Sequence, residues 1–136
     1  MSAFPSLSSD AARTVVAVTG LGMVFATKHF LADFIFQTNW MARGKEQPNG
    51  WGPPLLAHAL CHAVLTLAIT LVTVPRLWWL SLVDLGVHLA IDRSKTRLAQ
   101  RGGLRPDQAQ FWWLLGFDQY LHQLTNLSLA AALLLL

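Results

Sequence analysis

The stretch His29-Phe-Leu-Ala-Asp33-Phe-Ile-Phe-Gln37 places three polar side chains four residues apart, inside an apolar run that begins near Thr14. On an α-helix, residues at this spacing lie above one another on the same face. Ionisable side chains inside an apolar helix are energetically costly and usually functional. The stretch therefore predicts a helix with one functional polar face in apolar surroundings.

The same spacing recurs in three other apolar segments of the chain. The pairs are His58 with His62, His88 with Asp92, and Asp118 with His122. Together with His29 and Asp33 they use all five histidines of the sequence. Each of four segments thus contributes one pair of imidazole or carboxylate groups.

The composition is that of a membrane protein. Of the 136 residues, 54% are hydrophobic and only 12% are charged, well below the usual quarter for soluble domains. The net charge of +3 is small and scattered, so we expect no nucleic-acid partner. The single cysteine, Cys61, excludes an internal disulfide.

Glycine and proline separate the predicted helices. The loops are expected at about 42–53 and 100–106, and Pro75 ends the second helix. The fold predicted is all-α, an antiparallel four-helix transmembrane bundle in a single domain over residues 1–136. Its spans are expected at about 11–41, 54–74, 77–98 and 107–136.

Basic residues predict the orientation of this bundle. Seven lie in or next to the first and third loops: Arg43, Lys45, Arg93, Lys95, Arg97, Arg101 and Arg105. Only Arg13 and Arg76 lie toward the opposite side. The positive-inside rule then places the two loops in the cytoplasm and both termini outside it.

In such a bundle all four polar pairs fall at one level of the membrane. With a rise of about 1.5 Å per residue, each lies roughly 6–18 Å below the cytoplasmic helix ends. Because four separate helices contribute to this layer, the sequence predicts that the eight side chains meet.

Imidazole and carboxylate together are ligands for zinc, iron or manganese. The predicted metal ligands are His29, Asp33, His58, His62, His88, Asp92, Asp118 and His122. Eight ligands suffice for one or two divalent ions, and the three carboxylates offset much of the positive charge. Alternatively, the same pairs suit interhelical hydrogen bonds, a charge-paired polar core or a proton path.

Neighbouring polar residues are expected to support the ligands. Gln37, Asp84, Gln119 and Gln123 are candidates for orienting the imidazoles. Lys95 follows Asp92 by three residues and suits either a surface position or an anionic substrate group. For Lys28, beside His29, the sequence leaves a site role and a surface position open.

The motifs resemble a small family of bacterial membrane proteins catalogued as domain of unknown function 3307. They are His29-x-x-x-Asp33-x-x-x-Gln37 with Trp40-Met41-Ala42, His58-x-x-x-His62, His88-x-x-Ile91-Asp92-x-x-Lys95 and Asp118-Gln119-x-x-His122. The resemblance runs from about Thr27 to His122. It implies a four-helix integral membrane protein, which we expect in the bacterial inner membrane, and it supplies no catalytic roles.

Three functions fit these features. The first is a metal-dependent hydrolase of a lipid or lipid-linked substrate at the cytoplasmic leaflet, in which the metal activates water. The second is a non-enzymatic membrane component, either a metal or proton carrier or a subunit that works with a membrane protein partner or as a homo-oligomer. The third is haem binding by two facing histidines, against which the three aspartates argue.

Overall fold

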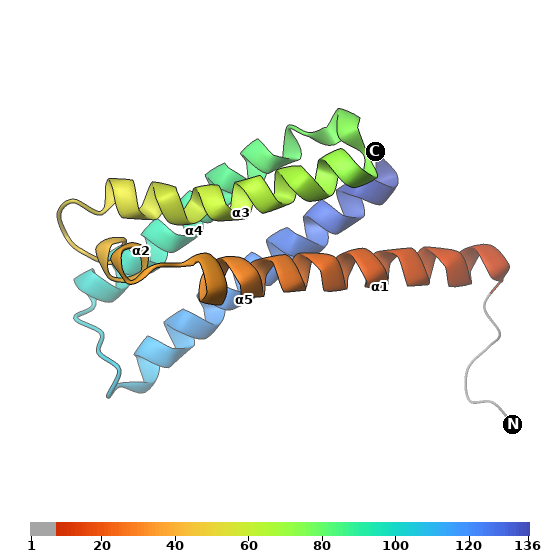
Figure 1. The fold of residues 1–136 in the computed structure, drawn as a ribbon. Helices are drawn as coiled ribbons and strands as arrows, with labels where there is room; N and C mark the ends of the chain where they lie inside the picture. Colours follow the sequence, from red (N-terminus) through yellow and green to blue (C-terminus); the bar gives the residue numbers. More distant parts are fainter. Residues whose placement is uncertain (1–7) are drawn as a thin grey trace, which may run out of the picture.

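The computed structural model describes residues 8–136, and this part of the chain is entirely helical, without β-strands (Figure 1). Five α-helices are connected by short turns. Their bounds are α1 Ser9–Phe30, α2 Asn39–Gly44, α3 Gly52–Thr73, α4 Leu80–Arg101 and α5 Ala109–Leu135. A π-helical turn, η1 (Leu31–Phe36), continues α1, and a 3-10 turn, η2 (Pro75–Leu77), lies between α3 and α4.

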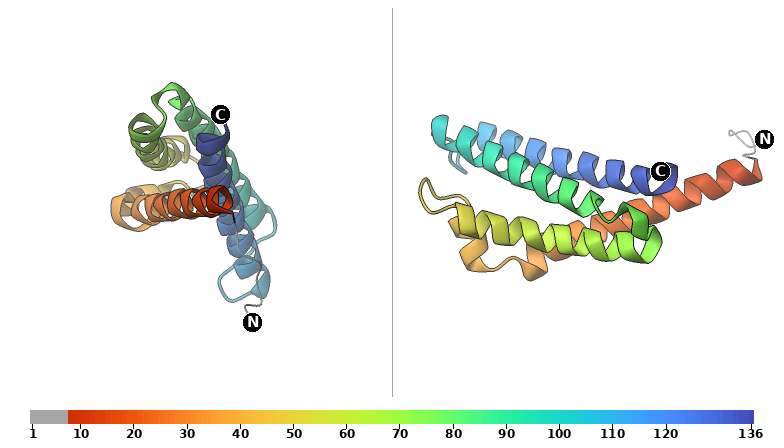
Figure 2. Two further views of the ribbon diagram at one scale, coloured as in Figure 1. Left: turned by 90° about the vertical axis from the view of Figure 1, so that its right-hand side faces the viewer. Right: turned by 90° about the horizontal axis from the view of Figure 1, so that it is seen from above.

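The four long helices run alternately up and down, as short connections between consecutive helices require (Figures 1 and 2). α3 packs on α4, α4 on α5, and α5 on α1, while α1 and η1 also touch α3. The N-terminal end of α1 extends past the ends of the other helices (Figure 1).

The first helix differs from the sequence prediction, which continued it to Met41. After the π-turn the backbone of Gln37 is extended, with ψ 112°, and the Thr38 side chain caps a new helix by accepting a hydrogen bond from the Met41 amide. The Gln37 side chain donates to the Asp33 carbonyl, which satisfies one of the last carbonyls of the π-turn. Residues 39–44 therefore form a separate short helix, α2.

α2 packs against the start of α3. A Cβ on Gly44 would lie 2.5 Å from Pro54 Cγ, so only glycine allows this close approach. The remaining boundaries lie within three residues of those predicted. Pro54 falls in the first turn of α3 and Pro75 follows its end.

Two helices are long and apolar enough to cross a membrane, namely Ser9–Phe36 and Gly52–Thr73. α4 and α5 do not meet the same criterion, because acidic, basic and amide side chains interrupt their apolar residues. The four-span bundle is therefore not established by length and composition alone.

The interior has an apolar end and a polar end. The apolar core lies where α3 ends and α4 begins, and its members are Phe25, Leu77, Leu80, Leu129, Ala130 and Leu133. Toward the opposite end the interior is polar. Among the described residues, ten apolar residues are buried, compared with fourteen that are polar or charged.

Candidate metal centre

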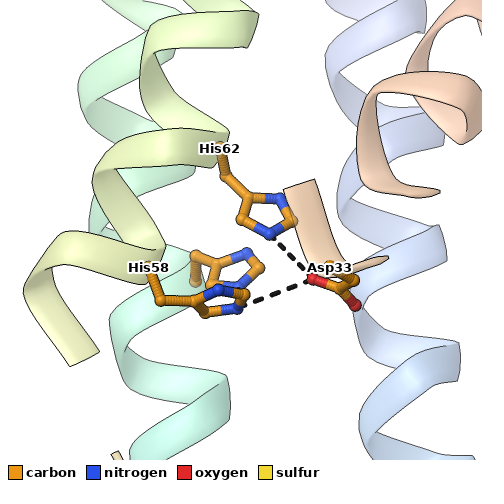
Figure 3. A group of neighbouring side chains, drawn as sticks. Asp33, His58 and His62 are labelled. Carbon is orange, nitrogen blue, oxygen red and sulfur yellow. Dashed lines mark hydrogen bonds and ion pairs between the residues drawn. The ribbon is translucent and has the colours of Figure 1, made fainter. Parts of the chain in front are cut away.

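The polar end of the interior contains all eight side chains singled out from the sequence. Figure 3 shows Asp33, from the π-turn, facing His58 and His62 of α3. The His62 Nε2 atom lies 2.9 Å from Asp33 Oδ1, and His58 Nε2 lies 3.6 Å from the same oxygen. The π-helical geometry, which is rare and frequently found at functional sites, thus carries the carboxylate of this group.

A second carboxylate, Asp92 of α4, lies on the other side of the cluster. Its Oδ1 atom is 3.0 Å from His122 Nε2 of α5. Its Oδ2 atom is 3.5 Å from His58 Nε2 and 3.8 Å from His88 Nε2. Asp92 therefore connects imidazoles from three helices.

His88 lies between the two carboxylate groups. Its Nε2 atom is 3.2 Å from that of His58. Its ring centroid lies 3.7 Å from that of the tilted His62 ring and 4.2 Å from that of His122, on which it stacks. All five histidines make their polar contacts within the cluster through Nε2. The Nε2 atoms of histidines from four helices therefore face the same region of the interior.

His29 and Asp118 lie at the edge of the cluster. His29 Nε2 is 3.1 Å from Asp33 Oδ2 and 3.4 Å from Gln119 Oε1. Asp118 Oδ1 is 3.7 Å from His122 Nε2 and, although it is buried, has no hydrogen-bond partner among residues 8–136. Both residues extend the donor set, and both contact Gln119.

The donor atoms fall into two groups that a metal ion could occupy. One contains Asp33, His58, His62 and His88, the other His88, Asp92 and His122, and within each group the donor atoms lie within 4.8 Å of one another. Ligands at about 2.1 Å from a tetrahedral ion are roughly 3.4 Å apart. Because several separations already fall between 2.9 and 3.8 Å, small side-chain movements would suffice to bind an ion.

Burying these imidazole and carboxylate groups costs free energy unless an opposite charge compensates them. The exposed fraction is 4% or less for every imidazole residue and for Asp92 and Asp118. The Nδ1 atoms of His58 and His62 have no hydrogen-bond partner among the described residues. Buried polar atoms that lack partners reduce stability. An ion bound at the Nε2 atoms would balance the charge of the buried carboxylates, but it would leave these two Nδ1 atoms unpaired.

Lys45 also contacts this cluster, which the sequence did not predict. Its ammonium lies 2.8 Å from Asp92 Oδ2, and it reaches the site from the turn that follows α2. Forty-seven residues separate the two, so no local spacing could have indicated the contact. Lys45 contributes a positive charge at the edge of the donor set.

The residues predicted to support the ligands take different positions. Gln119 contacts both His29 and Asp118. Gln37 instead binds the Asp33 backbone, and Lys95 pairs with Glu46 at 2.8 Å. For Gln123 no side-chain hydrogen bond is found within residues 8–136, and it is exposed.

Asp84 belongs to a second buried polar group, which lies farther than the His/Asp cluster from the loops 45–51 and 102–108. It accepts hydrogen bonds from Lys28 of α1 at 2.7 Å and from Thr66 of α3 at 2.6 Å. Lys28 is only 4% exposed, so it belongs to a buried ion pair and does not lie at the surface.

The fold and the cluster define an all-helical protein whose buried His/Asp groups could hold a metal ion. Residues 21–135 match the model of the family described as "Protein of unknown function (DUF3307)", and the chain belongs to this family. No curated protein and no solved structure matches the chain.

Proposed function

We propose that the protein is an integral membrane protein whose four long helices all span the bilayer. The distribution of side chains supports this proposal, because the interior is largely polar while large apolar side chains lie on the outside. Val16, Phe34 and Val72, for example, are 71%, 70% and 86% exposed. Such a surface suits lipid, whereas a soluble monomer rarely exposes a large continuous apolar area.

α4 and α5 fit the same arrangement despite their polar residues. Their acidic and imidazole groups, such as Asp84, His88 and His122, are buried within the bundle. Their outward faces carry Leu82, Val83, Phe117 and Leu124. Ionisable residues in membrane helices face the bundle interior in this way.

Within this bundle we propose a centre for one or two divalent cations. The observation that carries it is the convergence of imidazole and carboxylate side chains from four segments, six of which place their donor atoms in two groups no wider than 4.8 Å. Zinc, iron and manganese all accept this ligand set. The geometry gives no support to haem, because the His88 ring centroid lies only 3.7 Å from that of His62 and 4.2 Å from that of His122, too close for a porphyrin to fit between these rings.

The chemistry that this centre suits best is hydrolysis of a lipid or a lipid-linked substrate. A divalent cation polarises ester and phosphoryl groups and makes water a stronger nucleophile. A carboxylate not needed for metal binding, such as Asp118 with its unpartnered oxygen, could accept the proton of water. The layer lies within about 5–20 Å of the basic helix ends, which is within reach of lipid headgroups.

The test is turnover of lipid substrates by purified protein, with and without chelator. We expect hydrolysis to require zinc, iron or manganese and to be lost in Asp92→Ala, while Asp107→Asn, in an exposed loop, retains it. Undiminished turnover by metal-free protein would contradict the proposal. Absence of turnover together with a stable membrane partner in the purified material would favour an accessory subunit.

A further inference from the structure

A cavity of about 420 Å³ lies between α4 and α5, next to the His/Asp cluster. We call it the α4–α5 pocket. Its wall includes Thr96 on α4 and Leu114 and Leu115 on α5. Thr96 is one helical turn beyond Asp92, and Leu114 is one turn before Asp118, so the pocket adjoins the cluster on both helices.

The lining of this pocket is amphipathic. The apolar part comprises Ala99, Leu104, Phe111, Leu114 and Leu115. The polar part includes Lys95, Gln100 and Arg105 as hydrogen-bond donors, and Glu46 as the sole acidic group. Two cations beside an apolar wall suit a ligand with an anionic head and an apolar body.

Glu46 already occupies the anion position of this pocket. Its carboxylate lies 2.8 Å from Lys95 Nζ, and its backbone carbonyl accepts a hydrogen bond from Gln100 at 2.7 Å. Glu46 is on the loop between α2 and α3, and its side chain is 54% exposed, whereas that of Lys95 is 15% exposed. An incoming anion can therefore replace a carboxylate that returns readily to water.

We propose that the α4–α5 pocket binds the phosphate headgroup of an anionic lipid, with Lys95 as its principal partner and Glu46 as the internal anion that the lipid displaces. Arg105 adds a second positive charge at the mouth, where its side chain is 69% exposed. The assignment of this lipid as the substrate depends on the proposed function, because it places the phosphate one helical turn from the metal centre.

The experiment measures equilibrium binding of fluorescent phosphatidate to the protein in neutral detergent micelles, after treatment with chelator. We expect Lys95→Met to weaken binding at least tenfold and Glu46→Gln to strengthen it several-fold. The matched control is Arg101→Met, which removes an exposed cation from the same end of α4 outside the pocket and should leave binding unchanged.

Competition with unlabelled ligands shows whether the pocket recognises the whole anionic lipid, its acyl chains alone or its phosphate headgroup alone. We expect unlabelled phosphatidate to compete, and diacylglycerol and glycerol phosphate to compete at least tenfold less well. The proposal is overturned if diacylglycerol competes equally, if free glycerol phosphate does, or if Glu46→Gln weakens binding. None of these three outcomes needs the Lys95 variant, so they remain decisive if that variant misfolds.

The outcome is also distinct from that of the proposed function. If the protein binds phosphatidate selectively but contains no metal and has no turnover, the lipid-binding proposal is supported and the hydrolase proposal is contradicted. If the protein hydrolyses uncharged lipids in a metal-dependent way and Lys95→Met has no effect on this turnover, the hydrolase proposal is supported and the lipid-binding proposal is contradicted.

Discussion

At the scale of single residues, Lys45 and a bound cation would compete for the same carboxylate. Its ammonium lies 2.8 Å from Asp92 Oδ2, an oxygen that also faces His58 and His88. A divalent ion bound by these imidazoles would be repelled by this ammonium at short range and low dielectric. In the proposed metal centre Lys45 would therefore lower the affinity for a cation, and in the structure it forms an ion pair with Asp92.

Replacing this lysine tests that relation. We expect Lys45→Met to tighten zinc binding about tenfold, equivalent to about 1.4 kcal/mol, because the repulsion disappears and Asp92 Oδ2 becomes available. Zinc titration against a competing chelator measures the change. Arg43→Met, which removes an exposed cation from α2, is the control and should have little effect. Weaker zinc binding in Lys45→Met would show that the lysine supports the site structurally instead.

Single residues also show what local spacing can and cannot predict. The intervals of four residues identified which side chains share a helix face, and all eight candidates lie together in the structure. The sequence also predicted Asp84 to orient one of the imidazoles. In the folded chain Asp84 binds Lys28 and Thr66, because those partners lie at its own level of the bundle. A contact with a distant segment cannot be predicted from the residue spacing within one helix.

At the scale of secondary-structure elements, the buried Lys28–Asp84 pair connects α1 to α4, and Thr66 joins α3 to the same carboxylate. Both charged side chains are at most 3% exposed. The desolvation cost of such a pair is large, so its main effect is to fix which helix faces meet, and removal of one partner leaves an uncompensated charge.

We expect Asp84→Asn to lower the free energy of unfolding by about 3–5 kcal/mol, since it leaves the Lys28 ammonium buried without a counter-charge. The double variant Lys28→Met with Asp84→Asn should recover much of this loss. Thermal unfolding in detergent, followed by circular dichroism, measures both. Asp107→Asn, which breaks the exposed pair with Arg105, should cost less than about 1 kcal/mol. Equal destabilisation by the single and double variants would contradict this account.

The elements also show where the sequence prediction was incomplete. The four long helices follow from apolar runs bounded by glycine and proline, and their observed bounds agree closely at most ends. The exception is the end of the first helix. The apolar residues around Asp33 conceal both the π-turn and the cap at Thr38, although threonine before a short helix is a known start signal. The loop predicted at about 42–53 contains Lys45, but its contact with Asp92 was not predicted.

At the scale of the whole molecule, the arrangement of charge predicts a defined orientation in the membrane. The loops 45–51 and 102–108 lie at the end of the bundle nearest the His/Asp cluster, and η2 lies at the other end (Figure 1). The basic residues gather at the first of these ends. For the proposed membrane bundle, the positive-inside rule predicts that this end faces the cytoplasm.

Cysteine labelling tests that orientation. In a Cys61→Ser background, we expect Asn49→Cys and Asp107→Cys to react with an impermeant maleimide only from the cytoplasmic side. Arg76→Cys, next to η2, should react only from the opposite side. Labelling of all three after permeabilisation is the control for reactivity. Reaction of positions 49 and 76 from the same side of intact vesicles would exclude a four-span topology.

The central claim, that the bundle holds a divalent metal centre, is tested most directly by elemental analysis of the detergent-purified protein. Wild-type protein, His58→Ala and Asp92→Ala are compared after removal of loosely bound ions, with folding verified by circular dichroism. We predict near-stoichiometric zinc, iron or manganese in the wild type and its loss in both variants. A folded wild-type protein that binds none of these metals, even when they are supplied, would contradict the claim and reduce the eight side chains to a hydrogen-bonded polar core.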